Sequence, residues 1–315
     1  MNINYLDIAL FSSEWSEDSE LKQKYPILKK KVEISEDLSI APIDRKLADQ
    51  IIDCCEPRGL FDKHKNQDGE MEECRPLRVT PIMYAFAREK PPESDTFNWD
   101  VDNKLKTLIA LSRIIHPTTI CYQYSAKLKF DGDELLNIIP GLTSGPGSLA
   151  YIADTGRNWL TEGDAKELEQ LWSFYTRRNF SDQCSKTMWY FEYAFQNYFL
   201  EIRCLLIAAG IESLINTDSD RSTKQFIYRI QKLSELLDWN FNLSKTMADD
   251  MYGLRSKVAH GELINAAPKK ILELYKPMED ILRLTLKKFI IDEDFYAFIS
   301  DKDKVRNAWP LPKKD

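Results

Sequence analysis

The chain has 315 residues with 43 basic and 50 acidic side chains, which give a net charge of −7 at pH 7. This charge excludes a general nucleic-acid coat, so any site for a polyanion would have to be built locally. Hydrophobic residues make up 43% of the chain and aromatic residues 11%, which is enough for the cores of two domains. No stretch has the pattern of a signal peptide or of a run of about eighteen apolar residues, so we expect a cytoplasmic protein without membrane contact.

Residues 1–157 predict a mixed α/β domain of unassigned function. Pro81 indicates either an edge strand or a broken one, because proline cannot donate to a sheet ladder. The polar stretch Asp62–Glu73 indicates a surface loop. Strands are expected at Asn4–Phe11, Leu77–Ala87 and Thr119–Phe130, and helices at Ile43–Cys55 and Val101–Ile115.

Cys54, Cys55, His64 and Cys74 raise the question of a zinc site in this first domain. The first two are adjacent, and no Cys-x-x-Cys pair occurs in the chain. Without a secretory signal, we expect reduced thiols rather than disulfides. We therefore expect no metal site.

The stretch Gly141–Ser148, Gly-Leu-Thr-Ser-Gly-Pro-Gly-Ser, has the glycine content of a phosphate-binding loop. It lacks the Gly-Lys-Ser/Thr ending of such loops and does not open a helix of the right kind. A turn or a loop between strands is the better interpretation.

Residues 158–292 predict an all-α domain, so the fold class is α+β, and residues 293–315 are expected to form a polar C-terminal tail. The expected helices are Ala165–Arg177 capped by Thr161 to Asp164, a long central helix Met188–Asn216, a helix opened by the capping box Ser222–Gln225, a helix capped by Ser244, and a final helix from Pro268 to about Ile291.

The long central helix carries aromatic residues on several faces, which is typical of core packing rather than of a stacking platform for bases. Ala208, Ala209 and Gly210 would allow another helix to approach closely. Glu212 follows in apolar company and, as a buried carboxylate, needs a partner. We predict that this partner is Arg255.

The segment Met251–Gly261 lies on the helix that Ser244 is expected to cap. Arg255 stands roughly 60° to one side of that helix's apolar stripe and His260 roughly 160° away, so the two side chains are about 140° apart. At about 100° per residue, the stripe that faces the core consists of Met247, Met251, Leu254 and Val258.

The sector between Arg255 and His260 would leave a shallow floor suited to a phosphate. Gly261 is a good residue to follow a helix end, so His260 is expected on the last turn, where the helix carbonyls favour a protonated imidazole. The sector consists of the mostly small residues Ala248, Tyr252, Ser256 and Ala259.

The string Arg-Ser-Lys-Val-Ala-His-Gly at 255–261, with an aromatic residue three positions earlier, resembles the Arg-x(4–6)-His motif of HEPN domains, in particular the ApeA-like branch. The resemblance extends over residues 160–291, through a long helix with Ile-Glu-Ser-Leu at 211–214, a short helix, the motif helix and a last helix. It implies a HEPN-like helical bundle with catalytic residues Arg255 and His260. The supporting residues would be Glu212, Tyr252, Ser256, Lys257 and Gly261.

The resemblance implies a metal-independent endoribonuclease that needs no cofactor, takes RNA as its substrate and works as a homodimer. It also suggests a toxin or an anti-phage defence effector, and either role allows a regulatory ligand or an antitoxin as a partner. The chemistry agrees, because the 2′-hydroxyl of RNA is an internal nucleophile, so the enzyme need supply only proton transfer and phosphate stabilisation. Arg255 can grip two phosphate oxygens, and an imidazole with an ordinary pKa of about 6.5 exchanges protons at neutral pH.

The sequence also bears on two other classes of function. Ser256 stands where many HEPN nucleases carry Asn, Asp or His, so a catalytically inactive HEPN module that binds RNA or nucleotide and mediates dimerisation is the alternative. A Ser-His-Asp or Cys-His hydrolase is set aside, because neither His64 nor His116 has a recognisable nucleophile context.

Overall fold

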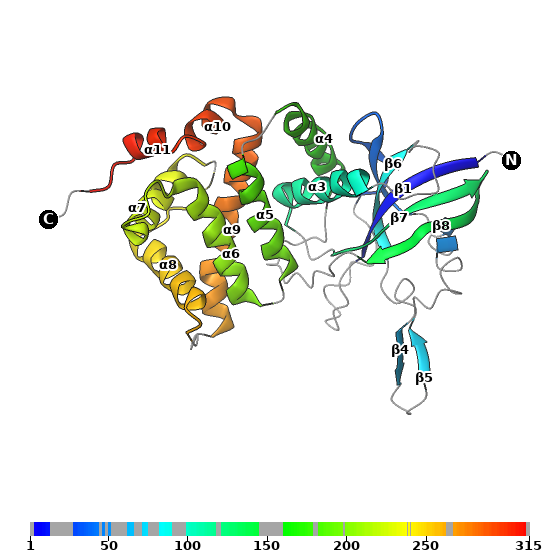
Figure 1. The fold of residues 1–315 in the computed structure, drawn as a ribbon, viewed down its shortest axis with the longest axis horizontal. Helices are drawn as coiled ribbons and strands as arrows, with labels where there is room; N and C mark the ends of the chain where they lie inside the picture. Colours follow the sequence, from blue (N-terminus) through cyan, green and yellow to red (C-terminus); the bar gives the residue numbers. More distant parts are fainter. Residues whose placement is uncertain are drawn as a thin grey trace. The chain divides into compact units, whose positions relative to one another are not determined.

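The computed structural model of the chain is α+β and divides into two compact units, Met1–Trp172 and Ser173–Asp315 (Figure 1). The division falls later than the domain boundary expected after residue 157. Within the described residues, no helix is long and apolar enough to cross a membrane. The structure describes residues 3–12, 28–43, 46–47, 50–51, 62–65, 71–74, 82–89, 99–117, 121–144, 160–178, 182–197, 199–237, 239, 241–262 and 267–312.

The first unit contains a six-stranded antiparallel sheet with the strand order β2-β3-β6-β1-β7-β8 (Figure 1). Helix α3 (Trp99–Ile115) packs on β1 and β6, and its Leu108 and Leu111 are fully buried. Leu128 and Ile138, paired across β7 and β8, also belong to the core. The strands are β1 (Ile3–Ser12), β2 (Val32–Glu33), β3 (Leu38–Pro42), β6 (Ile82–Glu89), β7 (Cys121–Asp131) and β8 (Glu134–Ser144).

The strands expected near Asn4 and Thr119 and the helix expected near Val101 are confirmed with small shifts at their ends. Of the two alternatives expected from Pro81, the edge position is wrong for β6, whereas a break at the proline lies outside the described residues. Strand β6 begins at Ile82, after the proline, so all of its residues can enter the ladder, and it pairs with β1 on one side and β3 on the other.

The surface loop expected over Asp62–Glu73 is also wrong. Strands β4 (Asp62–Lys65) and β5 (Met71–Cys74) pair there as an antiparallel ribbon. The polar side chains suggested a loop, but the backbone hydrogen bonds of a two-stranded ribbon need no apolar face.

Two expectations fall partly outside the described residues. Of the helix expected over Ile43–Cys55, residues 46–47 and 50–51 are helical and most of the rest lies outside. Of the glycine-rich stretch Gly141–Ser148, the first four residues belong to β8 and the others lie outside.

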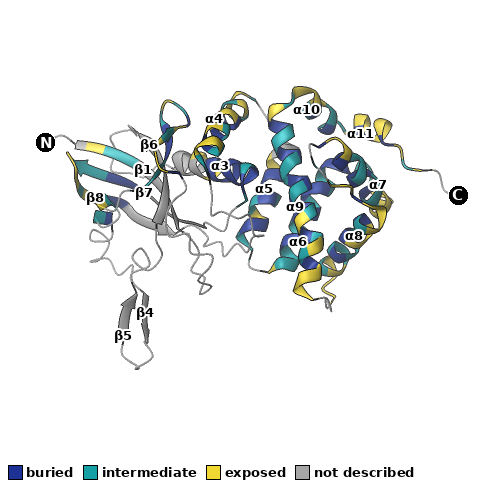
Figure 2. Cartoon of the chain, turned by 180° about the vertical axis from the view of Figure 1, so that it is seen from behind, coloured by how far each residue is buried: buried dark blue, intermediate teal, exposed yellow. Residues whose placement is uncertain are grey.

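The second unit is a helical bundle built around α6 (Leu200–Ile215), which contacts α5, α7, α8 and α9. Buried residues of α6 and α9 lie in the middle of the bundle, and exposed residues follow the outer sides of α8 and α11 (Figure 2). Because α6 is apolar nearly all round, it suits this central place. The other helices are α5 (Asp182–Gln196), α7 (Ser222–Glu235), α8 (Lys245–Ala259), α9 (Pro268–Ile291), α10 (Glu293–Ile299) and α11 (Lys302–Ala308).

Three sequence signals for helix starts are confirmed, although α4 begins at Glu162, three residues before the expected Ala165. Before α4 (Glu162–Arg177), the Thr161 backbone N–H donates to Asp164 Oδ2 at 2.7 Å and the Asp164 N–H donates to Thr161 Oγ1 at 3.2 Å. Ser244 Oγ accepts from the Met247 N–H at 3.1 Å at the start of α8, and α9 begins at Pro268. Side-chain acceptors and a preset φ therefore place these ends locally.

The capping box expected at Ser222–Gln225 is wrong. Helix α7 begins after Arg221, which has a φ of 53° and gives no side-chain cap. The Gln225 side chain is fully buried and hydrogen-bonds to the connection between α6 and α7 instead.

The single long helix expected over Met188–Asn216 is wrong, because α5 and α6 are separate helices packed on each other. Asn197 marks the break: its side-chain Nδ2 donates to the Tyr193 carbonyl at 3.0 Å, and its own carbonyl accepts from Arg203 Nε at 2.7 Å. These bonds satisfy carbonyl groups at the end of α5, so the chain leaves the helix without glycine or proline.

The division into two helices also separates the aromatic residues. Phe191 and Phe195 are fully buried, which confirms their predicted place in the core. Trp189 and Tyr193 are 47% and 42% exposed, so the core prediction is wrong for them. A helix that packs on one side leaves its other face open.

Gly210 provides the close helix approach expected from the sequence. A Cβ at this position would lie 2.8 Å from Leu282 Cδ2 of α9. The two helices therefore pack more closely here than a larger residue would allow.

The polar tail expected over residues 293–315 is wrong for most of its length. Helices α10 and α11 bury Phe295, Ile299 and Val305, and Trp309 follows with its ring against Phe298. Phe295 and Ile299 are four positions apart, and so are Val305 and Trp309, so each short helix places one pair of apolar residues on its buried side within an otherwise charged sequence.

Candidate functional site

The Arg255 side chain leaves α8 at the edge of the helix face that packs in the bundle. Ala248, Met251 and Leu254 are buried on that face. Helix α8 contacts α6, α7 and α9, and α6 supplies the hydrogen-bond partner of Arg255.

Glu212, in the last turn of α6, is the partner of Arg255. The guanidinium donates from Nη2 at 2.7 Å and from Nε at 3.1 Å, and both bonds go to Glu212 Oε2. The Arg255 side chain is 26% exposed and the Glu212 side chain 12% exposed. The predicted pairing is confirmed, and it fixes the guanidinium at a half-buried position between two helices.

Two aromatic rings lie behind this pair. The Tyr252 ring centroid is 5.7 Å from Arg255 Cζ, and the Phe226 ring of α7 lies 5.4 Å from the Tyr252 ring. A ring face attracts a guanidinium, so Tyr252 gives Arg255 a second contact besides Glu212. Nothing local in the sequence shows that Phe226 supports Tyr252.

His260 is the residue at which α8 ends. Gly261 has a φ of 68°, its N–H donates to the Val258 carbonyl at 3.1 Å, and the Glu262 N–H donates to the Lys257 carbonyl at 2.9 Å. These two bonds form a Schellman motif, which places His260 at the C-cap as predicted. The imidazole is exposed and makes no hydrogen bond with any residue that the structure describes.

Alanine is expected to have opposite effects on stability at Gly253, inside α8, and at Gly261, directly after its C-cap. Gly261→Ala should lower the free energy of unfolding by about 1–2 kcal/mol, because a left-handed φ is costly for a residue with a Cβ. Gly253→Ala should raise it by about 0.5–1 kcal/mol, because alanine is the better residue inside a helix. An added Cβ meets no atom within 4 Å at either position, so backbone conformation alone decides the sign. Chemical denaturation of both variants tests this, and a loss of stability in Gly253→Ala would contradict it.

The remaining predicted site residues do not gather into a floor. Tyr252 and Ser256 are half-buried, Lys257 and Ala259 are exposed, and Ala248 is fully buried, so the expected shallow surface is wrong at its Ala248 end. Arg255 and His260 make no contact with each other, which agrees with their calculated separation around the helix. One chain therefore presents a fixed guanidinium and a separate imidazole.

Glu212→Gln is expected to lower the free energy of unfolding by about 1–3 kcal/mol, because a half-buried guanidinium would lose its charged acceptor. Glu201→Gln makes the same change at another half-buried position of α6 and is the matched control. Thermal denaturation compares the two variants. Equal stability of wild type and Glu212→Gln would show that the pair is solvated and contributes little.

Arg229 is a further residue of this region that the sequence did not single out. It is 1% exposed and lies on α7 among Phe226, Ile230 and Leu233. The signal was available, because Arg229 is three positions after Phe226 and four before Leu233, within the apolar face of a helix.

Among the described residues no group of three or more His, Cys, Asp or Glu side chains could hold a metal ion. His64 lies on β4 opposite Glu72 of β5 in the strand register, and Cys74 of β5 lies opposite Asp62. Cys54 and Cys55 lie outside the described residues. Burial raises the pKa of the Cys204 thiol to about 12, so this thiol stays protonated.

In comparisons with known proteins, no family model, curated protein or solved structure matches the chain. What the protein does must therefore be inferred from the chemistry of its own residues.

Proposed function

We propose that the helical unit is a HEPN-type endoribonuclease that uses Arg255 and His260 on RNA without a metal ion. The observation that carries the proposal is the hydrogen-bonded Glu212–Arg255 pair, which fixes a guanidinium on the same helix whose end presents the exposed His260. A fixed cation can stabilise the charge on the phosphate, and a solvent-accessible imidazole can carry out a proton transfer of phosphodiester transesterification.

In the proposed reaction, the 2′-oxygen of one nucleotide attacks the adjacent phosphorus while the bond from phosphorus to the 5′-oxygen breaks. The proton of the 2′-hydroxyl is removed, and the departing 5′-oxygen receives a proton. His260 carries out one of these two proton transfers and a water molecule the other, while Arg255 stabilises the charge on the non-bridging oxygens. The products are a 2′,3′-cyclic phosphate and a 5′-hydroxyl end.

The proposal includes a homodimer. Because Arg255 and His260 of one chain do not meet, the α8 helix of a second copy would supply the missing residue to each phosphate. Light scattering should then give twice the monomer mass at micromolar concentration.

A mixing experiment tests the shared site directly. Arg255→Ala and His260→Ala are each expected to be inactive, but a heterodimer of the two would contain one site with both residues intact. Recovery of activity on mixing supports a shared site. No recovery, with exchange of subunits verified by mass, would show that the residues act within one chain.

The reaction itself is tested with end-labelled tRNA and mRNA in the presence of EDTA. Cleavage should yield cyclic phosphate ends, and an RNA with a single 2′-deoxy nucleotide should resist cutting at that nucleotide. Cleavage of DNA or a requirement for magnesium would reject this mechanism.

The alternative is a catalytically inactive module that binds RNA or nucleotide and mediates dimerisation. One observation favours the absence of catalysis. Arg255 donates to Glu212 from both Nε and Nη2, so only Nη1 and the outer hydrogen of Nη2 remain to stabilise a phosphate. Wild type that binds RNA and never cuts it would support this alternative.

A further inference from the structure

Arg229 is a buried cation whose hydrogen-bond partners are all neutral. Its Nη1 donates to the Ile215 carbonyl at 2.8 Å, to Thr217 Oγ1 at 2.9 Å and to Gln225 Oε1 at 2.8 Å. Its Nε donates to the Trp309 carbonyl at 3.2 Å. A cation without a direct carboxylate partner is costly to bury, and here neutral acceptors from three segments, the end of α6, α7 and the C-terminal segment, offset that cost.

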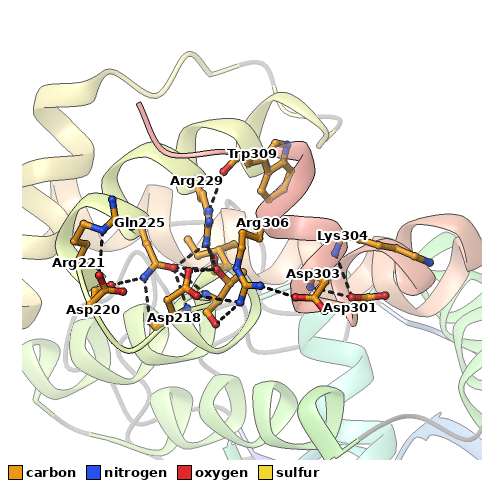
Figure 3. A network of polar contacts seen from close by, with 12 residues as sticks. Asp218, Asp220, Arg221, Gln225, Arg229, Asp301, Asp303, Lys304, Arg306 and Trp309 are labelled. Atoms are coloured by element: carbon orange, nitrogen blue, oxygen red, sulfur yellow. Dashed lines mark hydrogen bonds and ion pairs between the residues drawn. The ribbon is translucent and has the colours of Figure 1, made fainter. Parts of the chain in front are cut away.

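Gln225 fixes the connection between α6 and α7 on the same cluster (Figure 3). Its Oε1 accepts from the Thr217 N–H at 2.9 Å, and its Nε2 donates to the carbonyls of Asp218 at 2.9 Å and Asp220 at 2.6 Å. Arg229 and Gln225 therefore hold residues 215–220, which include the last residue of α6 and the start of the connection to α7, from one side.

The C-terminal segment holds this connection from the other side (Figure 3). Arg306 of α11 pairs with Asp218 at 2.9 Å and with Asp303 at 2.6 Å. The hydroxyl of Thr217, followed by the guanidinium of Arg306, keeps the pKa of Asp218 below its ordinary value, so the ion pair is formed at neutral pH. The Trp309 carbonyl then reaches Arg229 itself.

These contacts form a closed path that includes the candidate site. Phe226 and Arg229 lie one turn apart on α7, and Phe226 packs on Tyr252, which packs on Arg255. Arg255 binds Glu212, which lies one turn before Ile215, and the Ile215 carbonyl accepts a hydrogen bond from Arg229. A displacement of Arg229 would therefore move both the carboxylate and the aromatic support of Arg255.

We propose that Arg229 is a positioning residue that ties the C-terminal segment, through Trp309 and Arg306, to the last turn of α6 and so holds the Glu212–Arg255 pair in place. This rests on the proposed function, because Arg255 is the group whose placement matters to the reaction. Lysine cannot replace arginine here, since a single ammonium group lacks the planar fork that reaches carbonyls on both sides.

The test is nuclear magnetic resonance of the full chain labelled with ¹⁵N-arginine, with the Arg255 Nε–H signal assigned by its loss in Arg255→Lys. Arg229→Lys is expected to shift this signal and to speed its exchange with water. Arg306→Ala, which changes a side chain that is 44% exposed, is expected to fold and to give a smaller shift in the same direction.

Leu286→Ala is the control, because it opens the buried core of α9 without removing any of the polar contacts described. An Arg255 signal that stays in place in both Arg229→Lys and Arg306→Ala, or that moves equally in Leu286→Ala, would overturn the proposal. If Arg229→Lys does not fold, Arg306→Ala alone decides. RNA cleavage is measured separately, so a shifted signal in a protein that cuts no RNA would reject the proposed function and leave the positioning role standing.

Discussion

His260→Ala is expected to lower the rate of RNA cleavage by about 10²–10⁴-fold, the usual contribution of general acid–base catalysis. The structure predicts that the variant folds normally, because only the backbone N–H of His260 enters the helix-end bonds and its imidazole is exposed. RNA binding should persist, since Arg255 remains paired with Glu212. Single-turnover cleavage and a filter-binding assay on the same preparation separate the two effects.

Lys257→Ala is the matched control for this experiment, because Lys257 is exposed and lies one turn before His260 on α8. Removing its charge should weaken RNA binding moderately and leave the rate of the bound complex near wild type. Full activity of His260→Ala would show that this histidine is only a helix-end residue. An equal loss of cleavage rate in both variants would indicate that cleavage depends on the surface charge of α8 rather than on proton transfer by His260.

Glu279→Gln is expected to raise the free energy of unfolding at pH 8 by about 3 kcal/mol and to change it little at pH 4.5. Glu279 is 3% exposed on α9, and burial raises its pKa from 4.5 to about 7, opposed by Arg283, Tyr275 and Arg203 and reinforced by Asp280. A pKa shift from 4.5 to about 7 means that ionising Glu279 costs the folded chain about 3 kcal/mol more than the unfolded chain.

The sign follows from where the proton binds more tightly. Between pH 4.5 and 7 the folded chain keeps the Glu279 proton and the unfolded chain loses it, so stability falls as the pH rises through this range. Above pH 7 the carboxylate is ionised in both states and the loss is complete. Glutamine cannot ionise, so the variant should lack this fall.

Urea denaturation of wild type and Glu279→Gln at several pH values, followed by circular dichroism of the helices, measures the effect. Glu273→Gln removes the same charge from an exposed position of α9, and it should retain the wild-type fall between pH 4.5 and 7. Parallel curves for wild type and Glu279→Gln would show that this carboxylate is hydrated in solution.

The sequence by itself determined features that depend on residues a few positions apart. Ser244 and Pro268 predicted where α8 and α9 begin, and Gly261 predicted the end of α8, because caps and left-handed residues act within one turn. The pairing of Glu212 with Arg255 was also predictable, since each charged group lay beside an apolar stripe and needed a counter-charge.

Only the tertiary structure decided the features that depend on distant segments. Asn197 ends α5 with help from Arg203, which belongs to the next helix, and Gln225 leaves its expected cap to bind the connection between α6 and α7. Strand β6 lies inside the sheet because β3 and β1 both pair with it, which no local pattern shows.

The C-terminal segment shows the physical reason most clearly. Its composition is polar, and its few apolar residues gain stability only when α9 and α6 are present to cover them. The same holds for Arg229, whose charge is tolerated inside the bundle because carbonyls from Ile215 and Trp309, far apart in the chain, converge on it. Local patterns select helices and their ends, whereas the packing of distant segments selects which polar groups are buried and which partners they find.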